Sequence, residues 1–155
     1  MNNKKMLYEE VSRQILAVLA NEDNRIAQMA TLACLLAQAF PENIWTGFYL
    51  VDPTTSDELV VGPYQGTLGC LRIPYGKGVC GVAAATRETQ VIVDVHSFSG
   101  HIACDSRSAS EIVIPIIDAT GTLIAVLDID NPLIGAFDNT DQLALEALTK
   151  AVFSR

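Results

Sequence analysis

Two apolar segments late in the chain carry the strongest structural signal in the sequence. Residues 111–117 and 123–129 are rich in β-branched and aliphatic side chains, and Asp118-Ala119-Thr120-Gly121 lies between them. A short connection of turn-forming residues between two such runs predicts a β-hairpin. We therefore expect two antiparallel strands at the centre of a sheet.

Aromatic and β-branched residues predict further strands before this hairpin. Asp52 and Pro53 supply a turn after the first of them, so the first two strands should pair as antiparallel neighbours. A short helix of small residues is expected after a glycine-bracketed turn. The predicted strands are 45–51, 58–63, 70–74 and 90–94, and the predicted short helix is 82–85.

Helical spacing of apolar residues predicts longer helices at both ends of the chain. Two apolar series, at 7–19 and 26–37, are separated by turn residues 21–24, which can cap the second helix. A third series follows Asn139 or Thr140, either of which can serve as an N-cap. The order helix, helix, sheet, helix indicates an α+β fold with a mainly antiparallel sheet and the N- and C-terminal helices packed on one face.

Size and charge limit the classes of function. The chain has 155 residues, 50% of them hydrophobic and 18% charged, which suits a single folded domain over residues 1–155. The formal net charge of -8 would repel phosphate backbones, and no basic stripe is present, so we expect no nucleic-acid partner.

No run of about 18 apolar residues could span a bilayer, and acidic residues interrupt the N-terminal segment where a signal peptide would be apolar. We therefore expect a cytoplasmic protein without a membrane partner.

Three of the four cysteines lie in one glycine-rich, loop-like stretch. Cys80 lies 10 residues after Cys70, and Cys104 lies 34 residues after Cys70. No pair therefore has the spacing of a zinc knuckle or a thioredoxin-type redox turn. In a reducing compartment, cysteines are more often catalytic, metal-binding or buried than permanently bridged. The cluster suggests redox catalysis, whereas Cys34, on the apolar face of a predicted helix, is expected to be a buried small side chain.

Cys104 has polar neighbours that can change the reactivity of a thiol. His96, His101 and Arg107 lie in the same segment, and nearby cations lower the pKa of a cysteine, whereas the adjacent Asp105 has the opposite effect. The two histidines are expected to be hydrogen-bonding loop residues. The clustered cysteines and histidines offer ligands for a metal ion, but their irregular spacing argues against one, and we predict no metal site.

An acidic pair interrupts the last predicted strand. Leu127-Asp128-Ile129-Asp130 places two acids on one face, since side chains alternate with a period of two. If Glu111, at the start of the neighbouring strand, faces them, the three acids form an anionic cavity that would bind an ammonium group and raise the pKa of one acid. The alternative is that the acids reach solvent at the strand ends or cap the turn at Asn131-Pro132.

Five motifs from residue 62 onward are specific enough to indicate a family. They are Gly62-Pro63-Tyr64-Gln65-Gly66, Ile73-Pro74-Tyr75-Gly76-Lys77-Gly78-Val79-Cys80-Gly81, Asp94-Val95-His96, Gly100-His101-Ile102-Ala103-Cys104-Asp105 and Leu127-Asp128-Ile129-Asp130. With these motifs the chain resembles the free methionine-R-sulfoxide reductases, which are GAF-domain enzymes that reduce the R epimer of free methionine sulfoxide. The resemblance covers nearly the whole chain and implies a GAF-like fold.

The resemblance implies roles for the clustered cysteines. Cys104 matches the catalytic cysteine, whose thiolate attacks the sulfoxide sulfur and becomes a sulfenic acid. Cys70 and Cys80 match two cysteines that take part in disulfide recycling, and Cys70 is the expected partner of the sulfenic acid. The resulting disulfide would be reduced by thioredoxin, which is linked to NADPH, so no bound cofactor is expected.

The resemblance also implies a substrate pocket and a partner. Glu111, Asp128 and Asp130 match the family's acidic pocket residues, and we expect Asp130 to protonate the departing oxygen and Glu111 to bind the substrate ammonium. Trp45 is a candidate wall for the sulfoxide methyl group and Tyr49 is a further candidate, the alternative for Trp45 being an ordinary core aromatic. A homodimer is expected. The alternative functions are a non-catalytic GAF sensor of a small molecule or of redox state and a metal-binding regulatory module.

Overall fold

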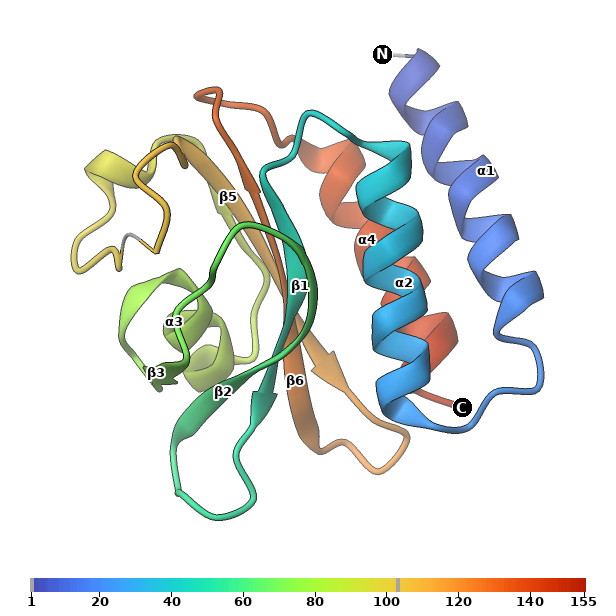
Figure 1. The fold of residues 1–155 in the computed structure, drawn as a ribbon, viewed down its shortest axis with the longest axis horizontal. Helices are drawn as coiled ribbons and strands as arrows, with labels where there is room; N and C mark the ends of the chain where they lie inside the picture. Colours follow the sequence, from blue (N-terminus) through green and yellow to red (C-terminus); the bar gives the residue numbers. More distant parts are fainter. Residues whose placement is uncertain (1, 103) are drawn as a thin grey trace.

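The computed structural model describes residues 2–102 and 104–155, and its elements follow the predicted order (Figure 1). Two helices come first, a sheet with a short helix follows, and one helix comes last. The elements are α1 (Asn2–Val18), α2 (Arg25–Ala39), β1 (Trp45–Val51), β2 (Glu58–Gly66), β3 (Arg72–Pro74), α3 (Gly78–Thr86), β4 (Gln90–Ile92), the 3₁₀ helix η1 (Val95–Ser97), β5 (Ser110–Ile117), β6 (Leu123–Asn131) and α4 (Asn139–Phe153). The predicted α+β class is confirmed.

The strands form a six-stranded sheet in the order β3-β2-β1-β6-β5-β4, and each neighbouring pair is antiparallel. The predicted hairpin is confirmed as β5 and β6, whose register runs from Ser110 opposite Asn131 to Ile117 opposite Leu123. β6 is central, as expected. β5 was expected at the centre too, but it lies one strand further out, because β1 pairs with the other edge of β6 and only the short strand β4 lies beyond β5.

Different helices cover the two faces of the sheet (Figure 1). α1, α2 and α4 lie together on one side, as predicted for the N- and C-terminal helices, whereas α3 lies on the opposite side. Alternation along β6 directs Leu127 and Ile129 toward the long helices and Val126 toward α3. Asp128 and Asp130 therefore share the face that α3 covers.

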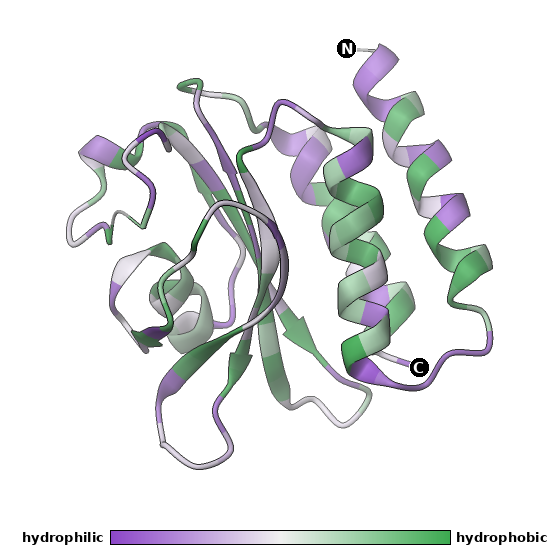
Figure 2. Cartoon of the chain, viewed as in Figure 1, coloured by the Kyte–Doolittle hydropathy of each residue, from purple (hydrophilic) through white to green (hydrophobic). Residues whose placement is uncertain are grey.

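The first two helices differ in the distribution of their apolar residues (Figure 2). α2 is largely hydrophobic along its length, whereas α1 alternates between hydrophobic and hydrophilic residues. Tyr8, Val11 and Ile15 form the buried stripe of α1, at the spacing that places side chains on one helix face. Within residues 2–102 and 104–155, no helix combines the length and the apolar content that crossing a bilayer requires.

The third helix begins earlier than predicted. α3 starts at Gly78 rather than at residue 82, so Cys80, which we expected in a loop, lies in its first turn. Gly78 has a φ of 60°, a left-handed conformation that glycine adopts without strain, and it joins the preceding turn directly to the helix. β3 is also shorter than predicted and starts at Arg72, which leaves Cys70 in the preceding loop.

Side chains that accept backbone hydrogen bonds define the starts of α2 and α4. Asn24 accepts from the first amides of α2, as predicted. The predicted cap of α4 at Asn139 or Thr140 is wrong, because Asp138 is the N-cap. The Asp138 carboxylate accepts from the amide of Thr140 at 2.6 Å, and Asp141 accepts from the amide of Asp138 at 2.7 Å, which is a reciprocal capping box.

Replacing Asp138 with alanine should lower the free energy of unfolding by about 1 kcal/mol, the usual cost of losing an N-cap side chain. Asn139→Ala should change it by less than about 0.5 kcal/mol, since Asn139 is exposed and already inside the helix. Urea denaturation followed by circular dichroism measures both variants. Equal losses would place the cap elsewhere than at Asp138.

Candidate active site

The residues predicted to form the site come together on the α3 face of the sheet. Side chains from β1, β5, β6 and α3 wall a pocket there, and residues 68–69, 101–102, 104–105 and 108 border it. Seven of the predicted residues line the pocket: Trp45, Tyr49, Cys80, Cys104, Glu111, Asp128 and Asp130. The remaining one, Cys70, is bonded to Cys104.

Sheet register brings the three acids together. Glu111 on β5 lies directly opposite Asp130 on β6, and Asp128 lies on the same face two residues before Asp130. Glu111 is 6% exposed and Asp128 is 5% exposed, while Asp130 is partly buried. The predicted cluster is therefore formed, and the alternative in which these acids reach solvent is wrong for Glu111 and Asp128.

Burial and mutual repulsion keep protons on this cluster. Burial, followed by the charges of Asp130 and Glu111, raises the pKa of Asp128 well above its usual range. Burial and the charge of Glu111 raise the pKa of Asp130 to about 7, although the Ser108 hydroxyl, which donates to Asp130 Oδ1 at 2.6 Å, acts in the opposite direction. A carboxyl group of this pKa can both give up and regain a proton near neutral pH.

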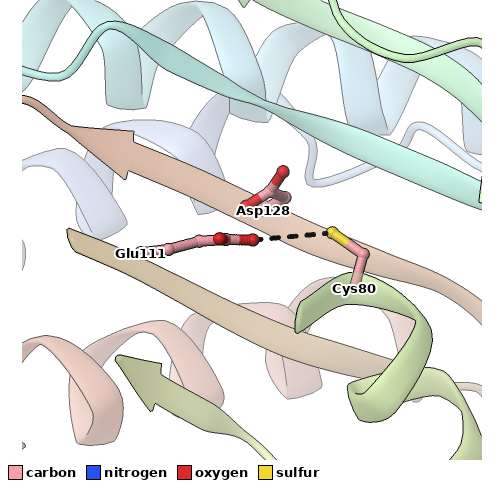
Figure 3. A group of neighbouring side chains, drawn as sticks. All are labelled: Cys80, Glu111 and Asp128. Carbon is pink, nitrogen blue, oxygen red and sulfur yellow. Dashed lines mark hydrogen bonds between the residues drawn. The ribbon is translucent and has the colours of Figure 1, made fainter. Parts of the chain in front are cut away.

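Cys80 belongs to the acid cluster rather than to the disulfide. Its Sγ lies 4.0 Å from Glu111 Oε1, and Figure 3 shows the thiol approaching from α3 while Glu111 and Asp128 approach from the sheet. Burial, together with the surrounding acids, raises the pKa of the Cys80 thiol well above its usual value. One possible ligand atom from each of these three side chains lies within 4.8 Å of the others, close enough to hold a metal ion.

A disulfide joins the two loops that border the pocket. Cys70, in the loop before β3, is bonded to Cys104, in the loop before β5, with a Cα–Cα distance of 5.4 Å. The Thr67 hydroxyl also donates to the Asp105 carboxylate at 2.7 Å, which ties the same loops a second time. Cys104 is exposed and Cys70 is half-buried, so the disulfide lies where another molecule can reach it.

Aromatic side chains form the apolar wall of the pocket. Trp45 stacks against Tyr49 and Tyr64, with ring centroids 5.4 and 5.1 Å away. Gly69 lies against this wall, because a Cβ added there would be 2.9 Å from the Tyr49 hydroxyl. The absence of a side chain at Gly69 thus lets the Cys70 segment pack directly on the aromatic rings.

Two polar atoms of the pocket are buried without a partner. Among the described residues, Trp45 Nε1 and Asp128 Oδ1 have no hydrogen bond, and both residues line the pocket. Buried polar atoms are nearly always paired in native proteins. These two atoms therefore indicate a place where a polar ligand or a water molecule binds.

His101 and Ser108 are site residues whose contacts the sequence interpretation missed. His101 Nε2 lies 3.6 Å from Glu111 Oε2, and this interaction raises the pKa of His101. The position of His101 inside the motif at residues 100–105 was the available signal. Ala103 of that motif lies outside the described residues, and His96, expected to behave like His101, is exposed.

The pocket is nearly closed when the disulfide is formed. Its cavity volume is about 30 Å³, room for about two water molecules. The contacts of His101 with Glu111 and of Ser108 with Asp130 hold one bordering loop against the acids. A ligand of amino-acid size therefore requires that loop to move.

Comparison with known proteins identifies the class. Residues 12–152 match the GAF domain family, and with the fold described above they define a GAF domain. Free methionine-R-sulfoxide reductase of Escherichia coli (strain K12) is 43% identical over 146 residues, which cover 94% of this chain and 86% of that protein. The chain belongs to the free methionine-R-sulfoxide reductases, a family of GAF-domain enzymes.

Solved structures agree with this assignment in fold. The X-ray structure of free methionine-R-sulfoxide reductase from Neisseria meningitidis, in complex with its substrate, superposes with a TM-score of 0.91 at 49% identity and covers 96% of this chain and 87% of that chain. A protein from Burkholderia vietnamiensis described as a putative GAF sensor superposes with a TM-score of 0.90 at 46% identity and covers 97% of this chain and 93% of that chain.

Mass spectrometry of the oxidised protein after blocking of free thiols should find one disulfide-linked pair of peptides, containing Cys70 and Cys104. Cys34 and Cys80 should carry the blocking group, because both are free thiols in this form. The pair should survive in Cys80→Ser and disappear in Cys70→Ser. A Cys80–Cys104 bond in the parent protein would contradict the structure.

Proposed function

We propose that this protein reduces free L-methionine-R-sulfoxide to L-methionine and that thioredoxin recycles the intramolecular disulfide that results. The observation that carries the proposal is the Cys70–Cys104 disulfide beside a pocket that contains Glu111, Asp128 and Asp130. A dithiol supplies two electrons, and crowded acids supply a proton and a site for a cation. Two relatives, at 43% and 49% identity, carry the name of this activity.

Substrate selection follows from the charge of the pocket. Free methionine sulfoxide carries an ammonium group, which a methionine sulfoxide residue inside a protein lacks. Glu111 binds this group, and Asp128 Oδ1, which has no partner among the described residues, can accept a second hydrogen bond from it. A bound cation would also favour the ionised form of Asp128. Trp45 supplies a flat apolar surface for the methyl group on sulfur.

The chemistry transfers the sulfoxide oxygen to Cys104. The Cys104 thiolate attacks the sulfur while Asp130 protonates the oxygen, which forms a transient S–S bond. The hydroxyl group then moves to the Cys104 sulfur, the S–S bond breaks, methionine leaves, and Cys104 is a sulfenic acid. The pKa of Asp130, about 7, suits this proton donation. The Cys70 thiol then attacks the sulfenic sulfur, which releases water and forms the disulfide. A thioredoxin dithiol reduces the disulfide and is itself oxidised.

Cys70, rather than Cys80, is proposed as the cysteine that reacts with the sulfenic acid. Cys70 is the partner of Cys104 in the disulfide. Cys80 is buried in α3 beside acids that raise its pKa, so little of it is thiolate at neutral pH. The part in recycling that the resemblance implies for Cys80 stays a prediction, as do the homodimer and the cytoplasmic location.

A redox sensor without turnover is the second candidate function. It is favoured by the nearly closed pocket of the disulfide form, since such a pocket would release a ligand on oxidation, and the related Burkholderia protein is described as a putative sensor. A sensor and a reductase differ in one product. Only the reductase releases methionine repeatedly when a reductant is supplied.

Coupled turnover with thioredoxin, thioredoxin reductase and NADPH should proceed with free L-methionine-R-sulfoxide and fail with the S epimer. N-acetylation of the substrate should reduce kcat/KM at least tenfold, because a charged partner lost from a buried site costs about 2–5 kcal/mol. Cys104→Ser is the control and should show no turnover. Oxidation of NADPH without release of methionine would refute the assignment of this substrate. Equal kcat/KM for the acetylated and the free compound would refute it as well.

Asp130→Asn should lower the single-turnover rate by about 10²–10⁴-fold at pH 6, the usual contribution of a proton donor. Because burial raises the pKa of Asp130 to about 7, the proton is present below that pH and is lost as pH rises through it. The ratio of parent to variant rates should therefore fall above pH 7. The ionisation of Cys104 affects both rates equally, so its effect cancels in this ratio. Glu111→Gln should instead raise KM. A ratio independent of pH would assign the proton to another acid.

A further inference from the structure

Three exposed apolar side chains flank the disulfide in the sequence. Leu68 is 77% exposed and Leu71 is 67% exposed, and they lie two residues before and one residue after Cys70. Ile102, two residues before Cys104, is 38% exposed. Large apolar side chains gathered at the surface often mark a site of interaction.

The fold brings these side chains to the same place, although they come from two loops. The Cys70–Cys104 bond and the Thr67–Asp105 hydrogen bond hold the loops together. Leu68 and Ile102 border the same pocket as Cys104. We call Leu68, Leu71 and Ile102 the disulfide rim.

In the disulfide form, contacts with α3 and β2 hold the rim in place. Ile102 packs over the start of α3, because a Cβ added to Gly78 would lie 3.2 Å from the Ile102 side chain. The carbonyl of Leu71 accepts from the amide of Val61 on β2 at 3.0 Å. In the disulfide form the rim is therefore a preformed surface, which reduces the ordering cost of a partner that binds to this form.

The small substrate does not account for the whole rim. Leu71 lies outside the pocket walls, and the pocket recognises its ligand through buried acids and an aromatic wall. A protein reductant, by contrast, must place a thiolate next to the disulfide, whose Cys104 side is exposed. In that position it must also contact the surrounding surface, which is the rim. The chemistry at the centre of the rim thus identifies the class of its partner.

We propose that the disulfide rim is the docking surface for a protein dithiol of the thioredoxin class. A thiolate of the docked protein attacks one sulfur, the Cys70–Cys104 bond breaks, and a mixed disulfide forms. The second thiol of the reductant then resolves the mixed disulfide. Two electrons pass to this protein, Cys70 and Cys104 end as thiols, and the reductant ends as a disulfide.

The test measures reduction of the purified disulfide form, with no methionine sulfoxide present, by thioredoxin and separately by dithiothreitol. Leu71→Ser should slow the second-order reaction with thioredoxin about 5- to 30-fold, the range typical of a residue that matters in an interface. Its reaction with dithiothreitol should stay within about twofold, because a small thiol needs no docking surface. Leu68→Ser should also lower the ratio of the thioredoxin rate to the dithiothreitol rate.

Leu143→Ser is the matched control, since Leu143 is 58% exposed and lies on α4, on the other side of the sheet from α3 and the pocket. It should leave both reactions unchanged. Unchanged thioredoxin rates in Leu71→Ser, or equal losses with both reductants, would overturn the docking surface. The inference rests on the proposed function only for the class of reductant. Failure to turn over methionine sulfoxide would refute the function, and this assay would still decide the docking surface.

Discussion

Glu111, Asp128 and Asp130 share one face of the sheet, and much of the site follows from burying them there. Three carboxyl groups at close range cannot all ionise without large repulsion, and burial adds to that cost. The pKa values of Asp128 and Asp130 rise accordingly, and the Cys80 thiol that approaches from α3 is affected in the same way. A cation entering the pocket would relieve the repulsion, so the destabilising arrangement is also a means of recognising an ammonium group.

The apolar core on the opposite face of the sheet offsets the free-energy cost of burying these acids. Leu127 and Ile129 alternate with the acids along β6 and pack with Phe48, Leu36 and Leu145 in the core beneath the long helices. Strand alternation thus separates a conventional apolar core from a polar pocket across the thickness of one sheet. A substitution on one face is expected to affect stability, and a substitution on the other is expected to affect chemistry.

The disulfide lies at the edge of a pocket that is nearly closed in this form. It joins the loops that border the acids, and in this form the cavity holds little more than water. In the proposed reaction, formation of the bond would favour release of methionine, and its reduction would favour entry of the next substrate. Since one fold supports many functions, the site rather than the GAF fold carries the functional assignment.

The sequence by itself determined the order of helices and strands, the hairpin of β5 and β6, the shared face of Asp128 and Asp130, and the family motifs. These features are local, because they depend on side-chain periodicity and on turn residues. Other features needed the tertiary structure. The earlier start of α3, which moves Cys80 into a helix, and the cap at Asp138 depend on which of several suitable residues finds a partner. The pairing of Cys70 with Cys104 was implied by the family resemblance and agrees with the structure, but side-chain periodicity does not encode it. The contact of His101 with Glu111 and the unpaired Asp128 Oδ1 depend on how distant segments meet in space.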